Sequence, residues 1–215
     1  MGCLFLLLPI IIVLPLIFVL VFFNIITISF GQLGLSNSTA LILLGATLVG
    51  SVINIPLTSR PVEYEKPQPF YSQFIYYFPP RVTRQVIAVN VGGAIIPTIF
   101  AAYLLPRSPL VPTLLATLIA ALVSRLLARI VPGVGIVMPA WIPPLVSGIL
   151  ALLLAHSNPA PVAYISGTVG TLIGADLLNW PNFKKLGGHM LSIGGAGVFD
   201  GIFLAGIIAV LITTI

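Results

Sequence analysis

The feature that most constrains this chain is the near absence of charge along it. No charged side chain occurs before Arg60, and a second charge-free run extends from residue 130 to residue 175. Charged residues make up 6% of the sequence, whereas soluble domains contain about 25%. A chain with so few charges cannot cover a water-facing surface, so the sequence indicates a polytopic membrane protein. We expect the lipid bilayer as a partner and no nucleic acid, and the single cysteine, Cys3, excludes an intramolecular disulfide.

The apolar stretches predict the number of membrane crossings, because a spanning helix needs roughly 20 mainly apolar residues. We expect an all-α integral membrane protein whose single domain, residues 1–215, contains about seven transmembrane helices, some of them broken by glycine and proline. The fifth stretch either spans the membrane or forms a re-entrant dip, since prolines and glycines crowd its first half. The expected spans are Leu4–Phe30, Thr39–Leu57, Arg84–Leu105, Leu110–Val131, Val134–Ala155, Pro161–Asn179 and Met190–Ile215.

The basic residues predict the orientation, because short loops rich in lysine and arginine stay in the cytoplasm. With seven spans and a cytoplasmic N-terminus, eight of the nine basic residues fall on the cytoplasmic side and only Arg107 falls on the other. If the fifth stretch were re-entrant, six basic residues would lie on the cytoplasmic side and three on the other side. We therefore expect a multi-pass protein of the plasma membrane. Residues 58–83, which are rich in aromatic side chains, then form a cytoplasmic or interfacial connection.

Two aspartates lie inside the expected spans, where ionisable groups are costly and mark functional sites by default. Asp176 is near the end of the sixth span, and Asp200 lies within the seventh. In an antiparallel hairpin that turns at Gly188, midway between them, the two carboxylates lie at the same depth. The motifs Gly170-x-x-x-Gly174 and Gly197-x-x-x-Gly201 allow close approach of the two helices. Alternatively, each aspartate caps a broken helix or bonds to serine and threonine hydroxyls.

Two amide side chains extend this polar group. Asn54 is expected about one turn from the cytoplasmic end of the second span, and Asn90 about two turns into the third. With Asp176 and Asp200 they form a layer of oxygen atoms, which are the ligands that Ca²⁺, Mg²⁺ and Mn²⁺ prefer. Glu63 is a further candidate ligand, unless it is a solvated loop charge. We therefore expect a divalent-cation site, in a transporter or channel for a small ion or solute, in a membrane enzyme or in a purely structural role.

Three glycine-rich strings carry a resemblance to a known family. They are Asn90-Val-Gly-Gly-Ala-Ile-Ile-Pro97, Gly170-Thr-Leu-Ile-Gly-Ala-Asp-Leu-Leu-Asn179 and Ser192-Ile-Gly-Gly-Ala-Gly-Val-Phe-Asp-Gly201. With them, most of the chain after about residue 46 resembles a prokaryotic membrane-protein family known as domain-of-unknown-function family sixteen-fourteen. The resemblance implies a polytopic prokaryotic membrane protein. It places Asn90, Asp176 and Asp200 within the family's motif blocks and implies no activity.

A second reading of the aspartates is catalytic. Two aspartates on neighbouring spans resemble, in geometry, the dyad of presenilin-type intramembrane aspartyl proteases. In such a dyad one carboxylate activates water as a base, and the other, protonated, polarises the peptide carbonyl. However, Asp176 follows Ala175 and Asp200 follows Phe199, so the Tyr-Asp and Gly-x-Gly-Asp motifs of those proteases are not reproduced. Both readings leave open whether the protein is a homo-oligomer.

Overall fold

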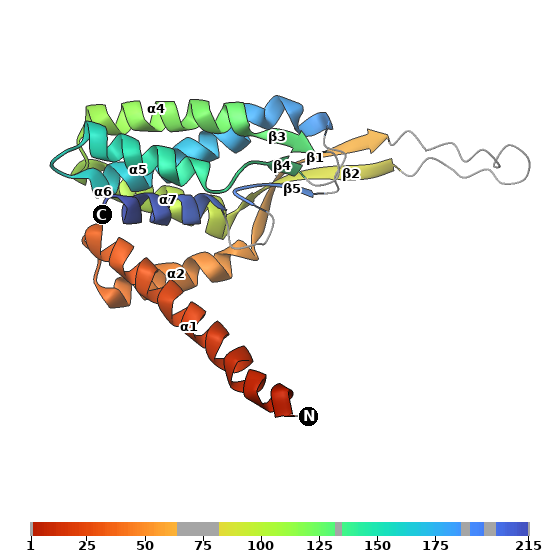
Figure 1. Ribbon diagram of the computed structural model, residues 1–215. Coiled ribbons are helices and arrows are strands. Elements are labelled where there is room, and N and C mark those ends of the chain that lie inside the picture. The colour runs from red at the N-terminus through yellow and green to blue at the C-terminus, as the bar shows by residue number, and fades with distance from the viewer. Residues whose placement is uncertain (1, 64–81, 132–134, 186–189, 196–200, 215) are drawn as a thin grey trace, which may run out of the picture.

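The computed structural model describes residues 2–63, 82–131, 135–185, 190–195 and 201–214, and the side chains of 13–59, 61, 84–129, 131, 136–181, 190–195 and 202–214. Within these residues the chain forms seven α-helices, five strands and several π or 3₁₀ segments (Figure 1). In chain order the elements are α1 (Gly2–Gln32), α2 (Asn37–Ser51), β1 (Asn54–Glu63), β2 (Val82–Asn90), π segment η1 (Val91–Ile95), α3 (Ile96–Leu104), η2 (Leu105–Arg107), α4 (Leu110–Leu127), β3 (Arg129–Val131), β4 (Gly135–Val137), α5 (Ile142–Leu154), α6 (Pro159–Ile165), π segments η3 (Ser166–Gly170) and η4 (Leu172–Asp176), η5 (Leu177–Lys185), β5 (Met190–Ile193) and α7 (Gly201–Ile212).

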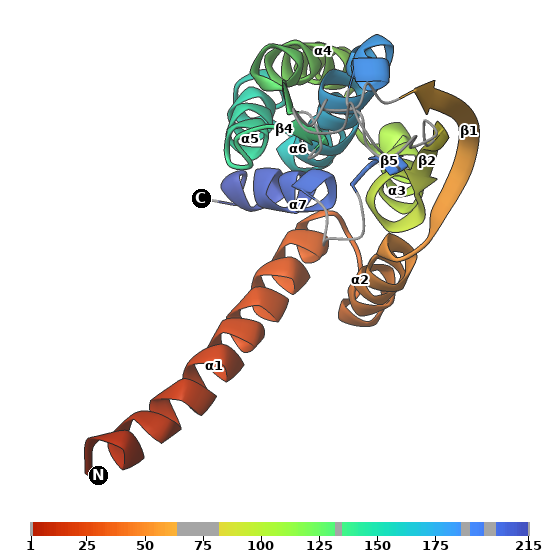
Figure 2. The ribbon, with the colours of Figure 1, turned by 90° about the vertical axis from the view of Figure 1, so that its right-hand side faces the viewer.

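Successive helices run in alternate directions between two ends of a bundle (Figure 1). One end, here called the strand end, carries β1 to β5. The opposite end carries the connections 33–36, 105–109 and 155–158. Helix α1 leaves the bundle at an angle, so only its C-terminal part lies against the other helices (Figures 1 and 2). The order of seven alternating helical segments therefore follows the order of the seven expected spans.

The expectation of an all-α chain is confirmed only in part, because the structure is mostly helical but also contains two small sheets. One has the order β1-β2-β5, and the other pairs β3 with β4. In the first, β1 and β2 are antiparallel over their whole length, and β2 and β5 are parallel. Five of the eight residues from Val82 to Val89 are β-branched, which favours a strand. The register shift between Pro56 and Thr58 lies beside a proline, which cannot donate a ladder hydrogen bond.

The sheets shorten four of the expected spans. The second ends at α2, before Asn54; the third begins with β2; the fifth begins with β4; and the seventh begins with β5. Three helical segments are long and apolar enough to cross a membrane: Val13–Gln32, Leu110–Leu127 and Pro159–Pro181. Shorter apolar helices cover Asn37–Ser51, Val91–Arg107, Ile142–Leu154 and Ile202–Ile212. The apolar helices indicate a membrane protein by their length and composition.

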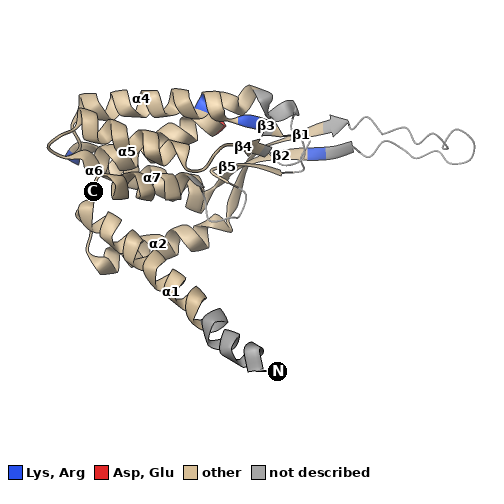
Figure 3. Cartoon of the chain, viewed as in Figure 1, with Lys and Arg blue, Asp and Glu red and all other residues tan. Residues whose placement is uncertain are grey.

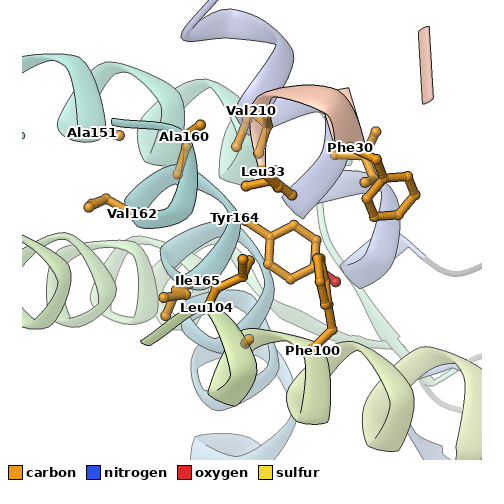
Figure 4. Close-up of a cluster of buried hydrophobic side chains, with 14 of the residues drawn as sticks. Phe30, Leu33, Phe100, Leu104, Ala151, Ala160, Val162, Tyr164, Ile165 and Val210 are labelled. Atoms are coloured by element: carbon orange, nitrogen blue, oxygen red, sulfur yellow. The ribbon is translucent and has the colours of Figure 1, made fainter. Parts of the chain in front are cut away.

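The main core lies where the end of α1 meets α3, α6 and α7. The fully buried ring of Tyr164 packs edge-on against Phe100, with 4.9 Å between the ring centroids (Figure 4). Phe30 of α1 packs on Phe100 at 5.8 Å and on Phe203 of α7 at 6.1 Å. Burial of such rings contributes about 1.5–3 kcal/mol each in water, and here it fixes the end of α1 to the bundle.

The outer surface of the bundle is apolar. On α4, for example, Leu126 is 83% exposed and Val111 is 66% exposed, while the small residues Ala116 and Ala120 face inward. This pattern, with large apolar side chains outside and small residues at helix contacts, is typical of helices that pack in lipid.

The described arginines are distributed unevenly between the two ends (Figure 3). Arg84 lies in β2, Arg125 in the last turn of α4 and Arg129 in β3, all at the strand end. Arg107 lies in η2 at the opposite end, with its guanidinium 4.5 Å from the ring centroid of Tyr103. Three arginines thus lie at one end of the bundle and Arg107 lies at the other, which is the division that the seven-span arrangement predicts.

Candidate functional site

Two parallel strands bring two glycine pairs to the same edge of the larger sheet. The register of β2 and β5 ends with Val89 opposite Ile193. Gly92-Gly93 follows the first strand and Gly194-Gly195 follows the second. The two segments touch, since a Cβ atom at residue 194 would lie 2.6 Å from the Cβ atom of Ala94. Segments that are about 100 residues apart in the sequence therefore meet at one point.

Asn90 holds the first glycine pair in place. It is 1% exposed and stands at the N-cap of η1, where its Oδ1 accepts a hydrogen bond from the Gly93 amide at 2.7 Å. Its Nδ2 donates to the Ser51 carbonyl at 2.6 Å and to Asn54 Oδ1 at 3.1 Å. One buried amide thus joins β2, η1, β1 and the end of α2.

Asn54 extends the network to the third motif. The hydroxyl of Ser192, in β5, donates to Asn54 Oδ1 at 2.6 Å. Because a carbonyl oxygen has two lone pairs and Asn90 uses the other, the acceptor capacity of Asn54 Oδ1 is filled. Asn54 therefore connects the strands through its oxygen, and that oxygen has no lone pair left for a cation in this geometry.

Asp176 contacts the second glycine pair. It is the last residue of η4 and is partly buried, and its Oδ2 accepts a hydrogen bond from the Gly194 amide at 2.7 Å. Gly194 has a φ of +83°, a left-handed conformation that side chains rarely adopt. Among the described residues no donor reaches Oδ1 and no basic side chain forms an ion pair with this carboxylate.

Close helix crossings support both sides of this site. Gly92 lies so close to α2 that a Cβ atom there would overlap the carbonyl oxygen of Thr47 and the amide of Ser51. Gly174 lies equally close to α4, where a Cβ atom would overlap the carbonyl oxygen of Ala121. Small-residue contacts of this kind let backbones approach closely, and they fix η1 and η4 relative to the bundle.

The structure brings three of the five predicted ligands to one region. Asn54 and Asn90 are in direct contact, and Asp176 joins them through the loop after β5. Glu63 is not brought there, because it ends β1 opposite Val82, while Asn54 begins that strand. Asp200, and with it the turn at Gly188, lies outside the described residues. Whether the carboxylates face each other, as a cation site or as a catalytic dyad, stays a prediction.

Sequence reasoning missed Ser192 as part of the site. The signal was present, because Ser192-Ile-Gly-Gly echoes Asn90-Val-Gly-Gly and both strings end parallel strands. It also missed three buried oxygen atoms near η4 that have no partner among the described residues: Ser124 Oγ, Thr171 Oγ1 and Asn179 Oδ1. Buried polar atoms of this kind commonly bind ordered water.

The chemistry available at this site is that of one carboxylate in a mostly neutral, oxygen-rich environment. Within the described parts of the chain, no group of three or more histidine, cysteine, aspartate or glutamate residues could hold a metal ion. A cation at Asp176 would therefore need the second aspartate, backbone carbonyls or water to complete its oxygen ligands.

A family model described as "Protein of unknown function (DUF1614)" matches residues 48–212. No curated protein and no solved structure matches the chain. The matched region contains all three motif segments and begins after α1.

Proposed function

Since the chain belongs to the DUF1614 family, whose description carries no activity, we propose from the geometry that it is a multi-pass membrane protein that binds a divalent cation at Asp176. The cation would be Ca²⁺, Mg²⁺ or Mn²⁺, and its binding would serve transport of that ion or of a small solute. The observation that carries the proposal is an Asp176 carboxylate near the end of an apolar helix, with no basic partner among the side chains that the structure describes.

The proposed membrane placement puts the strand end at the cytoplasmic face. Helix α4 has 18 residues, which gives a length of about 27 Å, close to the hydrocarbon thickness of about 30 Å. Arg125 near its C-terminus and Arg107 just before its N-terminus could reach the two headgroup layers. Exposed Trp141, 65% accessible at the strand end, and Tyr103 at the other end suit the two interfaces. The three described arginines at the strand end favour its cytoplasmic location.

An isolated charge at Asp176 is costly in apolar surroundings. An ionised carboxylate removed from water loses several kcal/mol of solvation unless a proton, a cation or hydrogen bonds replace the water. A single amide donor, from Gly194, reaches Asp176 within the described residues. A divalent cation would supply the missing stabilisation, and Asp200 would share it. The proposal that Asp200 is the second ligand is supported by Ile202, two residues later, which packs in the same apolar cluster as Ile193, the neighbour of Gly194.

The proposed roles of the other residues follow from their hydrogen bonds. Asn54 and Asn90 position the two glycine segments, because their oxygens already accept the donors of Ser192 and Gly93. The cation ligands are then Asp176 and Asp200, completed by backbone carbonyls or water. Glu63 stays a predicted ligand with no contact here that supports it.

The test separates charge from structure at one position. Asp176→Asn keeps an oxygen that can accept the Gly194 amide but removes the charge, whereas Asp176→Ala removes both. We expect wild-type protein in lipid nanodiscs to bind Mn²⁺ or Ca²⁺ in calorimetric titrations. Asp176→Asn should lower the affinity at least tenfold while its thermal midpoint stays close to wild type. Glu65→Gln, which removes one negative charge outside the expected spans, is the matched control and should bind normally.

Proteoliposomes loaded with a fluorescent indicator then test transport. Wild-type protein should take up the ion that it binds, and Asp176→Asn should not. Equal binding and equal uptake by wild type and Asp176→Asn would contradict the proposal and leave Asp176 as a loop-clamping residue. Cleavage of transmembrane peptides that survives chelation and is lost in Asp176→Asn would instead favour the aspartyl dyad.

A further inference from the structure

Helix α1 is the least packed of the long helices. From Val13 to Val21 every side chain is exposed, including Phe18 at 70% and Leu14 at 66%. Its described contacts with the bundle are made near its C-terminal end, where Ile26 and Phe30 are buried. The helix leaves the bundle at an angle (Figure 2) and precedes the family match, which begins at residue 48. The described side chains of α1 from residue 13 to residue 21 therefore lie outside the packed core.

Asn24 is a polar side chain in the second half of α1, on the face that points away from the bundle. Asn24 is exposed and lies about 200° around the helix from buried Ile26. One hydrogen of its Nδ2 bonds to the Leu20 carbonyl at 2.8 Å. The other Nδ2 hydrogen and Oδ1 have no partner among the described residues. Asn24 lies eight residues before the end of α1, or about 12 Å along the axis, which is at hydrocarbon depth if α1 spans the membrane.

We infer that Asn24 is the contact point of a homodimer in which α1 of one copy crosses α1 of a second copy. An amide that faces lipid gains by hydrogen bonding across a helix interface. Asparagine carries both a donor and an acceptor, so it is complementary to itself across a twofold axis, where the same residue meets its own copy. The second copy is thus the partner that this side chain fits.

The surrounding surface allows the crossing. Leu20 and Ile28, one turn on either side of Asn24, are 55% and 51% exposed. Gly31, about two turns further on, has open space where its Cβ would be, so a second helix can approach there. The hydroxyl of Thr27 is on the same side but already bonds to the Phe23 carbonyl at 2.8 Å, so it is available as a control.

The experiment measures dimerisation of the full-length protein in liposomes over a range of protein-to-lipid ratios, by energy transfer between labelled copies. Asn24→Leu should raise the dissociation constant about three- to twentyfold, the range expected for one or two interhelical hydrogen bonds in lipid. Asn24→Gln should recover part of the loss. Thr27→Val, a matched polar-to-apolar change, should leave the constant unchanged.

Cross-linking locates the interface in the same membranes. With Cys3 replaced by serine and Asn24 retained, single cysteines at exposed positions 20 and 28 should form covalent dimers, and cysteines at buried positions 26 and 29 should not. A wild-type protein that stays monomeric at all ratios would overturn the inference. So would a dimer that is unaffected by Asn24→Leu or that cross-links through exposed positions of α4. Cation binding at Asp176 is measured separately, so either proposal can fail alone.

Discussion

Replacing Gly92 by alanine should destabilise the fold far more than the same change at Gly45, although both glycines lie in helical segments. A Cβ atom at residue 92 would overlap two backbone atoms of α2 and lie 2.8 Å from a third, the carbonyl carbon of Gly50. Backbone atoms cannot rotate away as side chains do. Helix α2 and η1 would therefore have to separate by about 1 Å or more to restore van der Waals contact.

That separation acts directly on the site. Overpacking of a tight contact costs about 1–3 kcal/mol. The same movement would lengthen the 2.6 Å bond from Asn90 Nδ2 to the Ser51 carbonyl, and a buried donor left without its partner costs about 1–3 kcal/mol more. The expected total is about 2–6 kcal/mol. Gly45, by contrast, has no atom within 4 Å of the added methyl group, and alanine in a helix gains about 0.5–1 kcal/mol over glycine.

Thermal unfolding in detergent, followed by tryptophan fluorescence, gives the comparison. Gly92→Ala should lower the unfolding midpoint by about 5–20 °C, whereas Gly45→Ala should raise it by up to about 3 °C. A midpoint for Gly92→Ala equal to or above that of wild type would refute the close approach of α2 and η1, and with it the arrangement of the site.

Two further changes test the neighbourhood of Asp176. Gly194→Ala should destabilise the fold by about 2–5 kcal/mol, because residue 194 has a φ of +83° and its Cβ would lie 2.6 Å from that of Ala94. The thermal unfolding midpoint should fall clearly, and an unchanged midpoint would contradict the described turn. Ser124→Ala should move the thermal unfolding midpoint by less than about 3 °C, because it removes a buried hydroxyl that has no partner among the described residues. A large loss of stability would contradict this and would mean that the hydroxyl makes an important hydrogen bond.

The sequence predicted the helical part of the fold better than the rest. The expected span Pro161–Asn179 differs by two residues at each end from the helical segment Pro159–Pro181. The expected start at Leu110 is the start of α4. These boundaries were predictable because apolar runs in this chain end at prolines and polar turns, which interrupt helices for local reasons.

The sheets could not be predicted in the same way. The run Val86–Val89 is as apolar as the end of a spanning helix, and a buried strand shows no alternation of polar and apolar residues that would separate the two. The segment Met190–Ile193 is four residues long, too short for a periodic pattern. Its strand conformation depends on pairing with β2, which is information that no local window contains.

Three residues of the candidate site were predictable from the sequence, but their hydrogen bonds were not. Asn54, Asn90 and Asp176 stood out because polar groups are costly in apolar surroundings. Their hydrogen bonds depend on the register of β2 and β5, so neither the bond from Ser192 to Asn54 nor the bond from Gly194 to Asp176 could be read from spacing.

The parallel pairing of β2 with β5 also sets an order of events during synthesis. Parallel strands cannot form a local hairpin and need a crossover connection, which here consists of α3 to α6. Ser192 and Asn54, which the site joins, are 138 residues apart in the sequence. While the ribosome makes α3 to α6, one edge of β2 therefore stays unpaired and Asn54 lacks one of its donors. A nascent chain that stops before Met190 already contains six of the seven α-helices described, yet Asp176 in that chain has no Gly194 amide to bond. Contacts this distant in sequence form slowly, so completion of the polar site is a late step that follows helix insertion.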